Sequence, residues 1–192
     1  MFKILSFLFF ITFVIDGNAQ NQQNLTEIHC KHFFYGCPLG TPPTNDLIIR
    51  DIYALSSNDN TKFADWVAYK LTPDMLEGTP KTRNWKTDPW LDDNETLEPN
   101  DYKDISSANY DRGHQAPLAD FKGTQFWEQA NFLSNITPQS NELNQGPWEK
   151  LEEFERKMAK KFSLVYVLTG PVYNIEMPPL PSADEPQDGH FQ

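Results

Sequence analysis

The strongest constraint on the fold is an amphipathic helical pattern that leads directly into an apolar strand pattern. The segment PWEKLEEFERKMAKKF predicts a helix from Pro147 to about Phe162, because a proline opens it, glutamates follow and lysines crowd its last turns. Its apolar residues recur at helical spacing and are expected to pack in the core: Trp148, Leu151, Phe154 or Glu155, Met158 and Phe162. Residues 163–169, SLVYVLT, then predict a buried strand.

Two further strands are predicted in the first half of the chain. DLIIRDIYAL (residues 46–55) and KFADWVAYKL (62–71) are apolar, β-branched and aromatic, and the polar SSNDNT between them is typical of a hairpin loop. Residues 72–108 are irregular and interrupted by prolines, and a loop of that length usually forms or covers a functional site. Strands, a long loop, a helix and a strand in this order predict an α+β domain, with helices packed on a mixed, mostly antiparallel sheet.

The first nineteen residues have the pattern of an export signal. Lys3 precedes an apolar run from Ile4 to Ile15, and the small-residue stretch Gly17-Asn18-Ala19 follows, so cleavage after Ala19 is expected. The alternative, a membrane anchor, needs about twenty apolar residues, whereas this run has about a dozen. The sequence therefore predicts a secreted or periplasmic protein, with no stable membrane association once the signal is cleaved.

The chain has two cysteines, Cys30 and Cys37. In an oxidising compartment they are expected to form one local disulfide, which would pin residues 20–45 as an N-terminal arm. A zinc site is the alternative, because His29 and His32 flank Cys30. The spacing of these side chains matches no standard set of zinc ligands, so the sequence favours the disulfide.

Length and charge limit the class of protein. A chain of 192 residues with 39% hydrophobic residues fits one domain with a sizeable core, which we place at residues 46–176, followed by a Pro-rich acidic tail at 177–192. The net charge of −11 argues against a protein that coats nucleic acid, since neutralising phosphates supplies the affinity of such a protein. It does not argue against a hydrolase that uses a bound divalent cation, because the cation supplies local positive charge.

The stretch DRGHQA, residues 111–116, places a carboxylate, a guanidinium, a glycine and an imidazole on consecutive positions, and the glycine is expected to let the backbone bend. NELNQGPWEKLE begins about thirty residues later. With TKFADWVAYKLT, KTRNWKTDPWL, NFLSNITPQS, FERK and VLTGPVY, these segments closely resemble the DNA/RNA non-specific endonucleases, the family of Serratia-type nucleases and endonuclease G. The resemblance runs from about Gly36 to Tyr173 and implies a ββα-metal (His-Me finger) core.

This resemblance assigns roles to individual residues. His114 matches the general base, for which a satisfied core histidine is the alternative. Asn144 matches the metal ligand, with water filling most of the remaining coordination, and a turn or cap residue is the alternative there. Such a site suits Mg²⁺, with Mn²⁺ as a substitute. Arg83 and Arg112 match arginines that face the phosphate, where a planar guanidinium can meet two oxygens at once.

Further residues are expected to support the site. Glu152 matches a glutamate that steadies metal-bound water, and Arg156, one turn later, can pair with it; an ordinary surface ion pair is the alternative. Asp111 is expected to brace the DRGH turn or Arg112, and Asn135 matches a family asparagine near the site. Loop lysines that can follow the nucleic-acid backbone are Lys81, Lys86 and Lys122.

Together the resemblance implies a Mg²⁺-dependent endonuclease that cuts DNA and RNA without reading bases, leaves 5′-phosphates and can form a homodimer. Family members continue well beyond the TGPVY strand, whereas this chain ends after PLPSADEPQDGHFQ. We therefore expect a piece of a longer protein, or a shortened paralogue that lacks the usual C-terminal part. The rival interpretation is a non-catalytic member that binds nucleic acid or a partner protein. The intact set of predicted site residues argues against it, since drift would have removed some of them.

Overall fold

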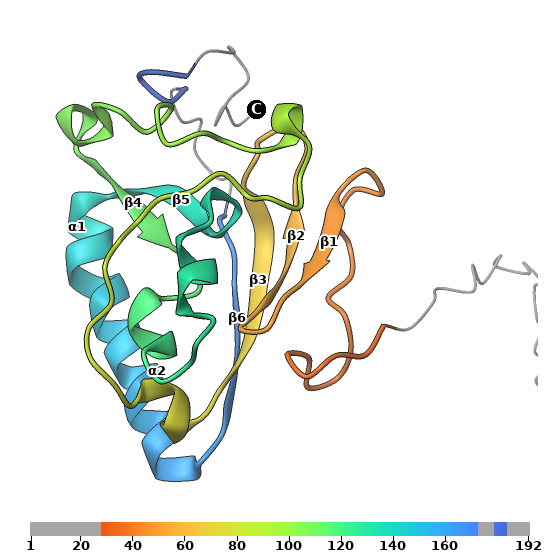
Figure 1. The fold of residues 1–192 in the computed structure, drawn as a ribbon, viewed down its shortest axis with the longest axis vertical. Helices are drawn as coiled ribbons and strands as arrows, with labels where there is room; N and C mark the ends of the chain where they lie inside the picture. The colour runs from red at the N-terminus through yellow and green to blue at the C-terminus, as the bar shows by residue number, and fades with distance from the viewer. Residues whose placement is uncertain (1–27, 173–178, 184–192) are drawn as a thin grey trace, which may run out of the picture.

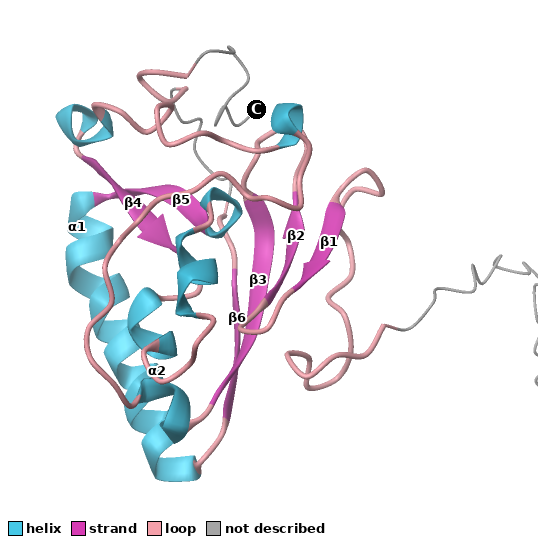
Figure 2. Cartoon of the chain, viewed as in Figure 1, coloured by secondary structure: helices cyan, strands magenta, loops and turns pink. Residues whose placement is uncertain are grey.

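The computed structural model describes residues 28–172 and 179–183, and the predicted signal, residues 1–19, lies outside them. The strands are β1 (Asp46–Ile49), β2 (Ala54–Ser57), β3 (Ala64–Leu71), β4 (Tyr110–His114), β5 (Ile136–Ser140) and β6 (Val165–Thr169). The helices are α1 (Asn141–Leu143), a π-helical turn (Asn144–Trp148) and α2 (Glu149–Phe162). Short 3-10 helices lie at Pro73–Leu76, Asp93–Glu95, Ile105–Ala108, Leu118–Phe121, Trp127–Asn131 and Leu133–Asn135. The predicted α+β class is confirmed (Figure 2).

Four strands form one antiparallel sheet in the order β1-β2-β3-β6 (Figure 1). Both faces of β3 are covered. Val67, Tyr69 and Leu71 pack in the main core, whereas Trp66 and Ala68 pack with residues of the N-terminal arm. Because successive side chains point to opposite faces of a sheet, a strand covered on both faces has a nearly continuous apolar sequence. This accounts for the strong strand pattern at residues 62–71.

Residues 46–55 were predicted as one strand, but they contain β1, a turn and the start of β2. β1 ends at Ile49, and the N–H of Arg50 donates to the carbonyl of Tyr53 at 2.8 Å before β2 begins. The guanidinium of Arg50 is buried and forms an ion pair with Asp88 in the long loop. The turn is therefore stabilised by a partner 38 residues away, which the local pattern does not contain.

The predicted helix is confirmed, but it turns a different face to the core. Ala159 is buried and packs in the main cluster, while Glu155 and Arg156 on the same side bond to groups beneath the helix. Of the predicted core residues, Leu151, Phe154 and Phe162 are exposed, at 43%, 55% and 61%, whereas Trp148, Met158 and the alternative Glu155 are half-buried. The sequence thus does contain an apolar stripe at helical spacing, but the more polar side of α2 is the one that faces the rest of the protein.

β4 and β5 form a second, two-stranded antiparallel sheet, in which His114 pairs with Ile136. The predicted bend at Gly113 is wrong, because DRGH lies within β4 and Gly113 is not among the positive-φ residues. The side chain of Gln139 crosses over this glycine, and a Cβ there would collide with it. Gly113 therefore permits close approach of a side chain and does not turn the backbone.

The N-terminal arm packs on the outer face of the larger sheet. The His32 ring donates from Nε2 to the carbonyl of Arg50 at 2.9 Å, and no cluster of three His, Cys, Asp or Glu side chains able to hold a metal occurs among the described residues. The zinc alternative therefore has no support in this part of the chain. Cys30 and Cys37 are half-buried free thiols, and their disulfide stays a prediction.

Two observations concern the ends of the described chain. Leu180, within the predicted tail, is buried with Tyr102 and Ile136 in a second apolar cluster. Within residues 28–172 and 179–183, no helix has the length and apolar character needed to cross a bilayer.

Candidate active site

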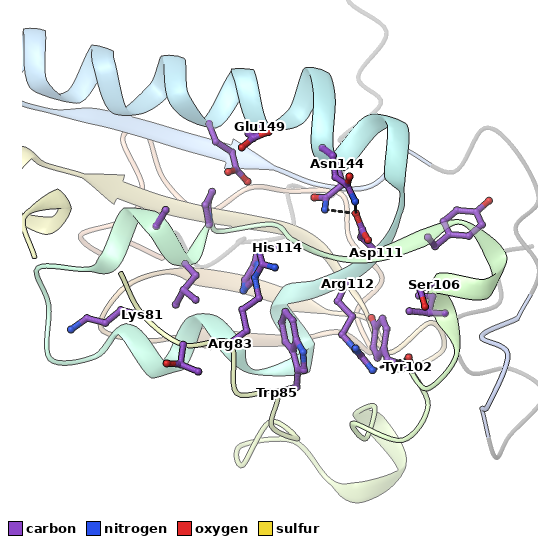
Figure 3. A pocket seen from close by; sticks show the side chains of 18 of the residues that line it. Lys81, Arg83, Trp85, Tyr102, Ser106, Asp111, Arg112, His114, Asn144 and Glu149 are labelled. Atoms are coloured by element: carbon purple, nitrogen blue, oxygen red, sulfur yellow. Dashed lines mark hydrogen bonds between the residues drawn. The ribbon is translucent and has the colours of Figure 1, made fainter. Parts of the chain in front are cut away.

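A pocket of about 1130 Å³ lies where β4, the α1–α2 segment and the long loop meet (Figure 3). The walls of the pocket include residues 80–83, 85 and 102–106 of the long loop, which was expected from its length to form or cover a functional site. The charged lining residues are Lys81, Arg83, Lys103, Arg112 and Lys122, together with Asp104, Asp111, Glu149 and Glu152. Cations thus slightly outnumber anions here, although the whole sequence has 16 Lys and Arg against 27 Asp and Glu. The pocket lining therefore lacks the excess of negative charge that the whole sequence has, so an anionic ligand is repelled less there than elsewhere on the surface.

His114 ends β4 at the centre of this pocket and is only 8% exposed (Figure 3). Burial lowers the pKa of its imidazole to about 4, aided by the positive charge of Arg83 and opposed by a hydrogen bond with Asn131. Its Nε2 is buried without a hydrogen-bond partner among the residues that the structure describes. The ring is therefore neutral at pH 7, the form that can accept a proton.

The two predicted phosphate-facing arginines are held in different ways. Arg83 is exposed on the long loop and lines the pocket. Arg112 lies between two rings, with its guanidinium carbon 5.7 Å from the Trp85 centroid and 5.6 Å from the Tyr102 centroid. It also donates to the carbonyl of Tyr102 at 2.8 Å. Arg112 is thus fixed from behind by neighbours, whereas Arg83 presents its charge to solvent.

Asn144, the predicted metal ligand, begins the π-helical turn that precedes α2. Pro147 within this turn has no N–H to donate to an earlier carbonyl, which accounts for the widened geometry. The alternative role as a helix cap involves only its backbone: Asn144 is the C-cap of α1, and its N–H donates to the carbonyl of Asn141, while Ser140 is the N-cap, with its Oγ accepting from the N–H of Leu143 at 3.3 Å. Asn144 is therefore available for a role in the pocket, which it lines.

The side chain of Asn144 is oriented by Asp111. Its Nδ2 donates to Asp111 Oδ2 at 2.9 Å, and Nε2 of Gln145 donates to the same oxygen at 2.8 Å (Figure 3). Because a carboxylate only accepts, the amide nitrogen must face it and Oδ1 of Asn144 is left for another partner. The structure thus places Asp111 against the predicted metal ligand and not against Arg112.

Glu152 and Arg156 lie one turn apart on α2, with Oε2 and Nη1 separated by 3.7 Å. Glu152 lines the pocket, and burial raises the pKa of its carboxyl to about 7, with Arg156 opposing the shift. Arg156 does not line the pocket. It lies behind Glu152 and donates to the buried carboxylate of Asp120 at 2.9 Å. The pair is therefore more than a surface contact, but only Glu152 reaches the pocket.

Asn135 does not line the pocket and is fully buried. Its amide accepts from the N–H of Ala116 at 2.9 Å and donates to the carbonyls of Ala116 and Ala130 at 3.0 and 2.9 Å. It therefore ties the chain that follows His114 to the neighbouring segment, a supporting position behind the site.

Of the three lysines predicted to follow the nucleic-acid backbone, two lie in the pocket wall and one does not. Lys81 and Lys122 line the pocket. Lys86 does not, and its Nζ pairs with Glu128 at 2.9 Å on the surface.

Two residues near His114 were missed by sequence reasoning. The indole ring of Trp85 lies 5.2 Å from the imidazole, centroid to centroid, at an angle of 38°. The amide of Asn131 bonds to the loop that carries Arg83, with Nδ2 donating to the carbonyl of Thr82 at 3.2 Å, and it opposes the lowering of the His114 pKa. Both residues lie within segments that carry the family resemblance, KTRNW and NFLSN, but no spacing rule links them to His114.

The donor set fits a hard divalent cation held by few protein groups. Asn144 Oδ1 is a carbonyl oxygen directed by Asp111, and Glu152 is a carboxylate at the pocket wall that can accept hydrogen bonds from metal-bound water. With so few protein ligands, most of the coordination would be water, which is the arrangement Mg²⁺ favours.

The chain is similar to known nucleases. Residues 34–185 match the family model of the DNA/RNA non-specific endonucleases. A nuclease from Serratia marcescens is 50% identical over 153 residues, which cover 78% of this chain and 57% of that protein. Human mitochondrial endonuclease G is 31% identical over 137 residues, 70% of this chain and 45% of that one.

A solved structure shares the fold. A crystal structure of the EndoG/EndoGI complex superposes with a TM-score of 0.61 at 27% identity, covering 75% of this chain and 60% of that one. The chain spans about half the length of the curated relatives it matches. With a family match across most of the sequence, the chain belongs to the DNA/RNA non-specific endonuclease family.

Proposed function

We propose that this protein hydrolyses phosphodiester bonds in DNA and RNA with the help of a bound divalent cation. The observation that carries the proposal is the position of His114, which is neutral, buried at the centre of the pocket and close to the positive charge of Arg83. A neutral imidazole there can take a proton from water as the water attacks phosphorus. Because burial disfavours the imidazolium, His114 stays available as a base across the neutral pH range.

Negative charge that develops on the phosphate would meet the two arginines. Arg83 is exposed at the pocket and can contact the non-bridging oxygens directly. Arg112 is held by the Tyr102 carbonyl and the rings of Trp85 and Tyr102, so its remaining N–H groups are directed before substrate arrives. Donors that are fixed in advance need little reorganisation in the transition state.

Asn144 would hold the cation through Oδ1, and Glu152 would accept hydrogen bonds from water at the wall of the pocket. When bound, the cation supplies charge neutralisation at the scissile phosphate and at the leaving 3′-oxygen. We propose Mg²⁺ for this role, with Mn²⁺ as a substitute, because amide and carboxylate oxygens suit hard cations. Departure of the 3′-oxygen leaves the phosphate on the 5′ end of the product.

The contacts proposed here are made to phosphate, which carries no sequence information. We therefore propose cleavage without base specificity, of single and double strands and of both sugars. We also propose that residues 1–19 direct export to the periplasm or the medium, on the basis of their apolar run. The Cys30–Cys37 disulfide and a homodimer belong to the same proposal.

The test is cleavage of supercoiled plasmid and of structured RNA by the purified protein, in Mg²⁺, in Mn²⁺ and in excess EDTA. Loss of both substrates with either metal, absent in EDTA, is the expected result, and product ends should accept no further phosphate from a kinase until they are dephosphorylated. No cleavage by a protein that melts cooperatively would contradict the proposal and favour a family member that only binds nucleic acid or a partner.

A further inference from the structure

Asp120 is a fully buried carboxylate directly beneath α2. It lies in the 3-10 helix Leu118–Phe121, six residues after His114, and is not one of the pocket-lining residues. Burying a carboxylate is costly unless it is paired and hydrogen-bonded, so its surroundings should supply a compensating group. The structure provides one from the helix above.

That group is Arg156. Its Nη1 donates to Asp120 Oδ1 at 2.9 Å and lies 3.7 Å from Oε2 of Glu152. The same nitrogen thus joins a buried carboxylate on one side to a pocket carboxylate on the other. Without Asp120, the guanidinium would keep only the longer contact to Glu152, one turn earlier on a helix whose outer side is open to solvent.

Two carboxylates, those of Asp120 and Glu152, contact this guanidinium, and a third lies nearby. Glu155 is the third, and its Oε2 accepts from the hydroxyl of Tyr69 at 3.0 Å; that hydroxyl also interacts with Asp120. Among the other charged groups, Lys122 acts on Asp120 from the following turn, and Glu153 acts on Arg156 from the exposed side of α2. The neighbours of Glu152 are therefore Arg156, Asp120 and Glu155, two of them negative.

The excess of negative charge favours proton uptake. Burial raises the pKa of Asp120 to about 6 and that of Glu152 to about 7, and the charge of Asp120 adds to the shift at Glu152. Asp120 is therefore linked to Glu152 by its charge as well as through Arg156, although it does not line the pocket.

We infer that Asp120 is a positioning residue, which fixes the Arg156 guanidinium from the buried side and through it sets the geometry and charge of Glu152 at the pocket wall. The inference rests on the proposed nuclease function only for its effect on rate. The hydrogen bond and the negative charge of Asp120 make separate contributions, and two substitutions separate them. Asp120→Asn keeps an oxygen that can accept from Arg156 and removes the charge, whereas Asp120→Ala removes both.

The first measurement needs no activity. Carboxyl carbon shifts of Glu152, followed by NMR from pH 4 to pH 9 in the metal-free protein, give its titration directly, with Glu152→Gln as the assignment control. The titration of Glu152 should move to lower pH in Asp120→Asn, because a neighbouring negative charge is gone. Glu153→Gln is the matched control, since it removes one exposed charge from the adjacent position of the same helix and should leave the Glu152 titration unchanged. An unshifted Glu152 titration in folded Asp120→Asn would overturn the inference.

The second measurement is the pH dependence of cleavage rate. Asp120→Ala should lower kcat roughly tenfold with little change in KM. Asp120→Asn should keep most of kcat, and the fall of kcat on the acidic side of its pH profile should move to lower pH. If Asp120 had a purely structural role, both variants would melt at lower temperature, but their folded fraction would keep the kcat and the pH profile of the unmodified protein. That result would overturn the inference. Lack of cleavage by the unmodified protein would refute the proposed function, while the titration would still decide the role of Asp120.

Discussion

Nδ2 of Asn144 donates a 2.9 Å hydrogen bond to Oδ2 of Asp111, so a residue of β4 sets which atom of the amide remains for a metal. Asp111 and Asn144 are 33 residues apart, and the link exists because β4 pairs with β5, which leads directly into α1. β4 thus ends at His114 and, through Asp111 near its other end, orients the predicted metal ligand Asn144.

Asp111→Ala should weaken metal binding by roughly ten- to a hundredfold, because the Asn144 amide loses the acceptor that orients it. Asp111→Asn retains an acceptor oxygen and should lose less. Mn²⁺ binding followed by electron paramagnetic resonance measures this without substrate, and the Mg²⁺ concentration for half-maximal cleavage provides a second readout. Equal Mn²⁺ affinity in the Ala variant and the unmodified protein would show that Asn144 does not need this support, or does not bind the metal.

His114 should make stability depend on pH. Its folded pKa of about 4 lies below the ordinary value near 6.5, so protonation favours the unfolded chain. The stabilising contribution of neutral His114 is fully present above about pH 6.5 and is lost as pH falls toward 4, by about 3 kcal/mol if the whole shift is expressed.

Urea unfolding from pH 4 to pH 8 checks this dependence by comparison with His114→Gln, which cannot titrate. Asp120 and Glu152, whose pKa values are raised, titrate in both proteins and cancel in the difference. The stability difference between the two proteins should therefore shrink or reverse as pH falls below 6.5. A difference that stays constant across this range would contradict the depressed pKa of His114.

The buried ion pair between Arg50 and Asp88 should be important for stability. The two side chains are 2% and 0% exposed, Ser134 donates to the same carboxylate, and the guanidinium lies 4.0 Å from the Trp90 centroid. Arg50→Met leaves Asp88 buried and charged, which should cost about 3–5 kcal/mol of unfolding free energy.

Removing one partner of the exposed Lys86–Glu128 pair gives the matched comparison. Its side chains are 39% and 53% exposed, so Glu128→Gln should change the free energy of unfolding by less than about 1 kcal/mol. Urea denaturation at pH 7 measures both variants. Similar small losses in the two would show that Asp88 finds another partner when Arg50 is removed.

Sequence reasoning predicted the residues of the site better than their contacts. The family resemblance assigned His114, Asn144 and Glu152 to one site, and all three line the same pocket. The contact of Asp111 with Asn144 was not predicted, because it depends on the register of β4 against β5.

Where the predicted fold was wrong, the cause is again a contact between residues far apart in the sequence. Arg50 interrupts an apolar run because it pairs with a distant carboxylate, which no local window contains. The outer face of α2 satisfies the pattern expected of a core-facing stripe, but burial is decided by what packs against a helix, and Arg156 and Glu155 have their partners on the other side. Gly113 was expected to permit a bend, whereas it lies within β4 and leaves room for the side chain of Gln139, which would have to move if a Cβ were present.

The most direct test of the account is the cleavage rate of His114→Ala beside that of His29→Ala, which removes an exposed histidine of the N-terminal arm. Both are measured on the same labelled duplex DNA and RNA at pH 8 in Mg²⁺, with melting curves to show that each protein is folded. Loss of a general base should reduce kcat at least ~100-fold for His114→Ala on both substrates, while His29→Ala keeps the unmodified rate. Cleavage by folded His114→Ala at the unmodified rate would show that this imidazole is not the base and would contradict the proposed mechanism.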